Sequence, residues 1–145
     1  MFAILLPIAF HAGLADPTTL ARETKAFAGT WAVTGMVMNG IEIPEGSYKD
    51  MRFEFAKNEV NAYHGKDLIA DGKFKVLAVV GKQVWFDITM GKGPDEGKTF
   101  PGVNVWVDGK TFKSCLAQPN QKRPLDVVSK ESDRRAIFEL KRIDK

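Results

Sequence analysis

Residues 72–90, GKFKVLAVVGKQVWFDITM, contain the pattern on which the fold prediction depends. Within residues 83–90, apolar side chains at every second position alternate with Trp85, Asp87 and Thr89. A period of two is typical of a strand that has one apolar face. Gly81 suits a tight turn between this strand and the one predicted before it. The stretch therefore predicts an antiparallel β-hairpin.

The same pattern recurs along most of the chain. Strands are predicted over residues 30–38, 51–57, 59–64, 72–80, 83–90, 99–107, 111–117 and 136–142, with 125–129 as a weaker ninth. Asn39-Gly40 and Asp108-Gly109 are dipeptides that favour two-residue hairpin turns. Consecutive strands joined in this way are antiparallel. The prediction is one all-β domain, either a sandwich or a closed barrel, and closure removes the exposed edges.

The N-terminal residues have a different character. Residues 1–15 carry no charged side chain, are too short to span a bilayer, and end in a small-x-small pattern at Ala15. We interpret residues 1–15 as a signal peptide, so that the domain is residues 16–145 and the mature protein is exported to the periplasm or the medium. The alternative is a buried apolar segment of the fold. Asp16 and Pro17 then predict the cap and first turn of a short helix that ends near Gly29.

Two groups of residues carry a family resemblance. Gly29-Thr30-Trp31 at the start of the first strand resembles the Gly-x-Trp opening of lipocalins. The series Gly93-Pro94-Asp95-Glu96-Gly97-Lys98-Thr99, Gly102, 108–112, 115–117, Arg123-Pro124 and 138–142 resembles the planctomycete-type lipocalin-like domain of unknown function. The resemblance covers residues 27–142 and implies export and an up-and-down antiparallel barrel of about eight strands with a short N-terminal helix. It implies no catalytic residues. Ser114 stands where the family pattern has an apolar residue.

Some residues have a predicted structural role in such a barrel. Trp31 is expected to plug its closed end, Gly29 to allow a sharp turn into the first strand, and Arg142 to lie over the Trp31 ring. The bulky residues predicted to point inward are Phe53, Phe55, Phe74, Phe86, Val105, Phe112, Leu116 and Phe138. All except Phe138 are the candidate ligand-binding residues. Eight strands enclose either a packed core or one small ligand.

Composition excludes several chemistries. Cys115 is the single cysteine and the histidines are two, so paired-cysteine zinc sites and poly-histidine metal sites are excluded. The 21 basic and 18 acidic residues give a net charge of +3, spread along the chain, which does not indicate nucleic-acid binding. The glycine-rich loop 91–99 does not match the spacing of a phosphate-binding loop. His64 is interpreted as a solvent-facing residue. We therefore expect no catalytic residues, no metal and no cofactor.

Binding is the function that these features favour. The leading hypothesis is a non-enzymatic, exported module that holds a small apolar ligand in the mouth of the barrel, with no membrane anchor in the mature chain. The alternative is a protein-interaction or inhibitor module that uses rim loops and two tryptophans, Trp85 and Trp106, on the outer face.

Overall fold

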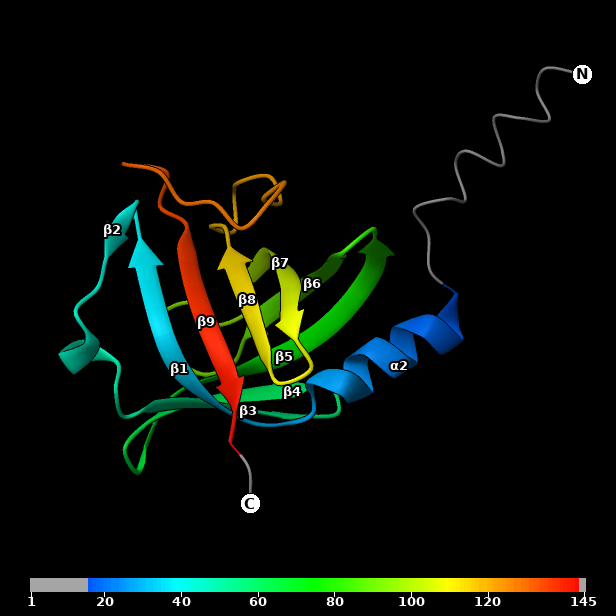
Figure 1. Ribbon diagram of the computed structural model, residues 1–145, viewed down its shortest axis with the longest axis horizontal. Helices are drawn as coiled ribbons and strands as arrows, with labels where there is room; N and C mark the ends of the chain where they lie inside the picture. The colour runs from blue at the N-terminus through cyan, green and yellow to red at the C-terminus, as the bar shows by residue number, and fades with distance from the viewer. Residues whose placement is uncertain (1–15, 144–145) are drawn as a thin grey trace, which may run out of the picture.

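The computed structural model describes residues 16–143, which form a closed antiparallel β-barrel with one helix at its N-terminus (Figure 1). The helix is α2 (Pro17–Phe27), and a 3₁₀ turn, η2, covers Glu45–Ser47. The strands are β1 (Gly29–Met38), β2 (Ile41–Glu42), β3 (Met51–Ala56), β4 (Glu59–His64), β5 (Asp67–Val80), β6 (Gln83–Met90), β7 (Thr99–Asp108), β8 (Thr111–Leu116) and β9 (Ala136–Arg142).

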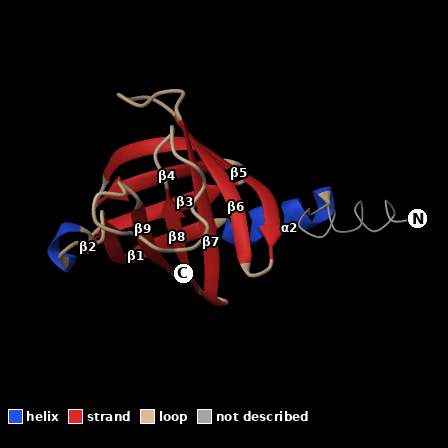
Figure 2. Cartoon of the chain, turned by 90° about the horizontal axis from the view of Figure 1, so that it is seen from above, coloured by secondary structure: helices blue, strands red, loops and turns tan. Residues whose placement is uncertain are grey.

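Pairing between the first and last strands closes the barrel. β3 to β9 follow one another in order, and β9 pairs with β1 from Trp31↔Arg142 to Met38↔Ala136. Figure 2 shows the strands curving around a common interior. The two-residue β2 lies outside this ring and pairs only with the end of β1. The predicted up-and-down barrel of eight strands with a short N-terminal helix is confirmed.

Most predicted element boundaries agree with the structure, and three differ. Residues 125–129 form no strand and instead belong to a long connection between β8 and β9. β5 begins at Asp67, five residues before the predicted start, because Ala70 and Leu68 still pair with β4 across a register shift. The short β2 was not predicted, since two residues are too few to show a period of two.

Helix α2 closes one end of the barrel. Asp16 caps it by accepting a hydrogen bond of 2.8 Å from the backbone N–H of Thr19, and Pro17 occupies the first turn. At its other end Phe27 is fully buried and stacks on Trp106 at a centroid distance of 4.6 Å. We call this the closed end; the opposite end, with the β4–β5 turn and the long β6–β7 and β8–β9 loops, is the open end.

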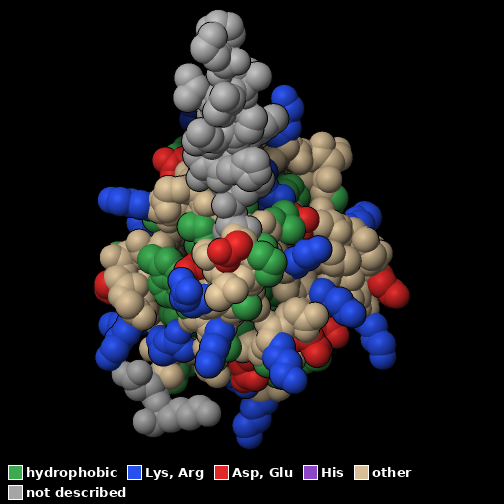
Figure 3. Space-filling model, turned by 90° about the vertical axis from the view of Figure 1, so that its right-hand side faces the viewer, with side chains coloured by type: hydrophobic (Ala, Val, Ile, Leu, Met, Phe, Trp, Pro, Cys, Tyr) green, Lys and Arg blue, Asp and Glu red, His purple; other side chains and the backbone are tan. Residues whose placement is uncertain are grey.

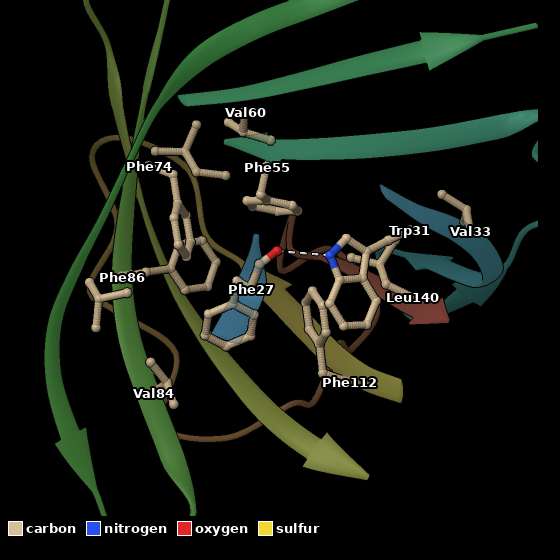
Figure 4. Close-up of a cluster of buried hydrophobic side chains, with 12 residues drawn as sticks. Phe27, Trp31, Val33, Phe55, Val60, Phe74, Val84, Phe86, Phe112 and Leu140 are labelled. Carbon is tan, nitrogen blue, oxygen red and sulfur yellow. Dashed lines mark hydrogen bonds between the residues drawn. The ribbon is translucent and has the colours of Figure 1, made fainter. Parts of the chain in front are cut away.

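Aromatic rings fill the closed half of the interior (Figure 4). Phe112 meets the rings of Phe27 and Trp31 edge to face at 4.9 and 4.7 Å, and Phe74 meets those of Phe27 and Phe55 at 5.7 and 4.9 Å. The Trp31 Nε1–H donates to the carbonyl of Phe27 over 2.9 Å. Each ring thus has a defined partner, and the indole N–H is satisfied although Trp31 is fully buried.

The inner face of β7 is the opposite of the predicted one. Gly102 pairs with the inward Phe86, Asn104 pairs with Ser114, and Trp106 pairs with Phe112, so these even-numbered residues face the interior. Val105 faces outward, and its prediction as an inward ligand-binding residue is wrong. The prediction placed the valines of β7 on the inner face because they are apolar, but the outer face of this strand is apolar as well.

The reason for that apolar outer face is the connection 117–135, which lies outside the barrel. Val103 and Cys115 are fully buried although they point away from the interior, and the Cys115 Sγ–H donates to the carbonyl of Val128 over 3.7 Å. Strands covered on both faces lose the simple alternation of apolar and polar residues. The apolar pattern of β7 therefore did not identify the inner face.

Candidate functional site

The open half of the barrel contains a cavity of about 220 Å³. Seven strands contribute to its walls, from β3 through β9. The lining residues are Phe53, Val60, Ala62, Ala70, Asp71, Ile88, Met90, Phe100, Leu116 and Phe138. Nine of these ten side chains are apolar. The barrel is accordingly packed at its closed end and hollow toward its open end.

The hollow follows from the size of the residues on adjacent strands. Ala62 of β4 and Ala70 of β5 are directly paired and both line the cavity. Further along the same two strands Val60 pairs with Gly72, where a Cβ would lie 2.8 Å from the backbone oxygen of Thr89, so this glycine serves the close approach of β6 and does not add to the cavity. At the closed end, by contrast, the inward positions carry the rings of Phe55 and Phe74. Small side chains therefore leave space in the open half of the barrel, whereas aromatic rings fill the closed half.

The structure divides the predicted ligand-binding residues into three groups. Phe53 and Leu116 line the cavity, as does Phe138, which was predicted to point inward. The residues packed into the hydrophobic core without lining the cavity are Phe55, Phe74, Phe86 and Phe112. Val105 lies on the outside.

Sequence reasoning missed seven lining residues, Val60, Ala62, Ala70, Asp71, Ile88, Met90 and Phe100. It selected bulky side chains, whereas a cavity requires small ones such as Ala62 and Ala70. The alternation within residues 83–90 already placed Ile88 on the face of Phe86. Phe100 would have followed from a correct assignment of the inner face of β7.

Asp71 is the one charged residue of the lining, and its polar groups are used by the β6–β7 loop. Its backbone carbonyl accepts the N–H of Gly91 at 2.8 Å, and its Oδ1 accepts the N–H of Lys92 at 3.2 Å. The space above Gly91 is taken by this carboxylate, since a Cβ there would lie only 2.3 Å from Oδ1. Asp71 thus anchors the glycine-rich loop at the mouth, and the walls offer a ligand apolar contacts.

Arg123 holds the long β8–β9 connection against the outside of the barrel. Its Nη2 donates to Asp87 Oδ1 over 2.8 Å, and its Nη1 donates to the carbonyls of Gly102 and Phe86. Its guanidinium also lies 5.7 Å from the centroid of the Trp85 ring. Charge-assisted hydrogen bonds to β6 and β7 make this connection part of the folded structure.

Asp133 organises the end of the same connection. Its carboxylate accepts the backbone N–H groups of Lys130 and Arg135 at 2.6 and 2.8 Å, and the hydroxyl of Ser129 at 3.3 Å. Desolvation alone would raise the pKa of Asp133, but these hydrogen bonds outweigh it, and the pKa lies below its ordinary value.

The two tryptophans of the alternative hypothesis lie on opposite faces. Trp106 packs inside against Phe27 and Phe112, and its Nε1–H donates to Glu23 of α2 over 3.3 Å. Trp85 is outside and half-buried, with Arg123 over its ring. The prediction that both form an outer-face anchor is wrong, because the inner face of β7 carries Trp106.

The residues considered for catalysis or metal binding do not converge. His64 is exposed at the end of β4. Burial raises the pKa of the Cys115 thiol, so the reactive thiolate is disfavoured. Within residues 16–143, no group of three His, Cys, Asp or Glu side chains is placed to hold a metal ion.

In the same described part of the chain, no helix has the length and apolar character needed to cross a membrane. The predicted signal peptide, residues 1–15, lies outside the described residues.

No family model, curated protein or solved structure matches the sequence or the fold of this chain.

Proposed function

We propose that this protein is a non-enzymatic binding module that holds a small apolar ligand in the open half of its barrel. The observation that carries the proposal is the 220 Å³ cavity with nine apolar side chains in its walls. An apolar protein cavity of about 150 Å³ stays dry and takes up a ligand of the size of benzene. The space here is larger, and it has the same kind of lining.

The walls also indicate how a ligand lies. Because Asp71 is engaged with Gly91 and Lys92, the walls favour the apolar part of a ligand, and a polar group is best placed at the mouth, in water. Each methylene transferred from water contributes about 0.8 kcal/mol. A water-sized group occupies roughly 30 Å³, so the cavity of about 220 Å³ holds about seven such groups. The expected ligand is therefore a single ring or a short chain with one polar end.

The test is ligand binding by a variant that fills the cavity. Ala62→Phe adds a ring at a lining position, whereas Asn61→Phe adds the same ring to the next residue of β4, on the outer face. We expect the unmodified protein and Asn61→Phe to bind a short-chain alcohol or a small aromatic ligand, measured by calorimetry or by displacement of a fluorescent dye. Ala62→Phe should bind at least about tenfold more weakly, because the space for the ligand is occupied.

Equal binding by Ala62→Phe and the unmodified protein, with both shown to be folded by circular dichroism, would exclude the cavity as the site. Native mass spectrometry of protein from its own host gives a second measurement. A ligand-free mass, together with no binding of any apolar probe, would remove the proposal.

Export and family membership belong to the same proposal. The uncharged stretch that ends at Ala15 supports a secreted protein whose mature chain starts at Asp16. N-terminal sequencing of the protein from its host tests this directly, and a chain that still begins at Met1 would contradict it. The barrel supports the resemblance to the planctomycete-type lipocalin-like domain, which implies no activity.

A further inference from the structure

Two polar side chains are buried inside the barrel. Charged side chains lie on the surface, as Figure 3 shows for the side that carries α2. Within residues 16–143, Asn104 and Ser114 are the only buried polar residues, with 1% and 6% of their surface exposed. They belong to β7 and β8, pair directly with each other and face the interior. Because directly paired residues have Cβ atoms about 4.5–5.5 Å apart, the two side chains form one polar group in the core. We call it the polar pair.

The polar pair is not satisfied by the protein. Asn104 Oδ1 has no hydrogen-bond partner among the described residues, and the Ser114 hydroxyl makes no hydrogen bond in the same range. Nearly all buried polar groups in native proteins have a partner, because an unpaired one lowers stability. Local features that cost stability without a structural return are typical of functional sites. The polar pair is therefore a candidate for contact with a ligand.

The polar pair borders the inner end of the cavity. Ser114 pairs with Phe138 of β9, and the next residue of β8 on the same face is Leu116. Both Phe138 and Leu116 line the cavity. Since β8 runs from the closed end toward the open end, Ser114 lies deeper than Leu116, by about 7 Å for two residues of a strand. These two apolar side chains thus lie between the cavity and the polar pair, with Ser114 nearer and Asn104 beyond it.

We propose that the polar pair is a subsite for a hydroxyl group at the inner end of the ligand. The inference rests on the proposed function, because it concerns the same ligand in the same cavity. A hydroxyl that passes between Leu116 and Phe138 donates a hydrogen bond to Asn104 Oδ1 and accepts one from Ser114. The apolar body of the ligand fills the cavity behind it. The polar pair thus provides a position for a polar group in addition to the mouth.

The unpaired acceptor selects the kind of polar group. Asn104 Oδ1 needs a donor, so a carbonyl or ether oxygen of a ligand would leave it unpaired. An ammonium group donates, but the burial of its charge in an apolar interior is costly. A hydroxyl is neutral, and it both donates and accepts. The expected ligand class is therefore a small alcohol or phenol.

A comparison of phenol with toluene tests the subsite. The two molecules are similar in size, but only phenol has a hydroxyl, so the ratio of their affinities reports the contact that this group makes. The test variants are Asn104→Leu and Ser114→Ala. The control is Thr99→Val, which removes a hydroxyl from the outer face of β7, where Thr99 bonds Thr89. Calorimetry measures both affinities, and urea unfolding checks that each variant is folded.

The ratio of phenol affinity to toluene affinity should fall about tenfold in Asn104→Leu and about threefold in Ser114→Ala, because each variant removes a hydrogen bond to the hydroxyl. Thr99→Val should leave the ratio unchanged. An unchanged ratio in both test variants, or an equal fall in the control, would overturn the inference while leaving the proposed function in place. If the unmodified protein binds neither molecule, the proposed function fails and this inference fails with it.

Discussion

The guanidinium of Arg142 lies 4.2 Å from the centroid of the Trp31 ring and also donates hydrogen bonds of 2.9 Å to the carbonyls of Ala26 and Ala28. One side chain from the last strand thus covers the plug of the barrel and satisfies carbonyls at the end of α2. The helix, the first strand and the last strand are joined at this point. The closed end is therefore the place where substitutions should cost most stability.

Trp31→Ala should destabilise the protein by about 3–5 kcal/mol, because it removes a fully buried indole and leaves a cavity among aromatic rings. Trp85→Ala serves as the control, since Trp85 is half-buried on the outside, and it should cost less. Urea unfolding followed by circular dichroism measures both. Equal losses in the two variants would contradict the plug assignment.

Gly29→Ala should cost at least about 1–3 kcal/mol, the usual cost of a strained backbone conformation. Gly29 has a φ of +130°, and a Cβ there would lie 2.6 Å from Arg142 Nη1. The substitution therefore strains the backbone and displaces the guanidinium. Gly81→Ala provides a comparison, because Gly81 also has a positive φ but a Cβ added there would meet open space. A smaller loss in Gly29→Ala than in Gly81→Ala would show that contact with Arg142 has no energetic importance.

Asn104→Leu should stabilise the protein by about 1–2 kcal/mol. The Asn104 side chain faces the interior, is 1% exposed, and its Oδ1 has no hydrogen-bond partner within the described residues. An unsatisfied buried acceptor costs about 1–3 kcal/mol, and a similarly sized apolar side chain removes that cost. Thermal and urea unfolding measure the change. A clear loss of stability would show that the amide makes an interaction which the leucine cannot replace.

Acid should loosen the end of the β8–β9 connection through Asp133. Its pKa lies below the ordinary value of about 3.9, so its contribution to stability is complete well above that pH and is lost as the pH falls through the lower, folded-state value. The amide resonances of Lys130 and Arg135 report this titration in NMR spectra. Asp133→Asn should remove it, and an unchanged titration in that variant would assign it to another group.

Cys115 should resist thiol reagents until the connection 117–135 opens. The thiol is fully buried beneath Val128, and burial raises its pKa. We expect labelling with a maleimide to be at least about a hundredfold slower in the native protein than in urea. Asp133→Ala, which removes an anchor of the connection, should accelerate native labelling. Rapid labelling of the unmodified native protein would contradict the burial of Cys115 beneath the connection 117–135.

Local signals account for the parts of the fold that were predicted correctly. Asp16 and Pro17 identify the start of α2, because a cap and a proline act within one turn of helix. Asn39 and Gly40 adopt φ values of 53° and 76°, which their dipeptide favours, and they join β1 to β2. The period of two then identified strands; it left a sandwich and a closed barrel as alternatives, and the family resemblance implied the barrel. The candidate site was predicted less well, since Phe53 and Leu116 line the cavity but Val105 lies outside.

The amino-acid sequence by itself determined the strands, the turns, the capped helix and an interior rich in phenylalanine, because each depends on residues close together in the chain. Only the tertiary structure decided which face of β7 points inward, since the connection 117–135 buries Val103 and Cys115 on the other side. It alone also decided where the barrel is hollow. A cavity depends on small residues meeting across paired strands, as Ala62 and Ala70 do, and such a meeting is set by strand register.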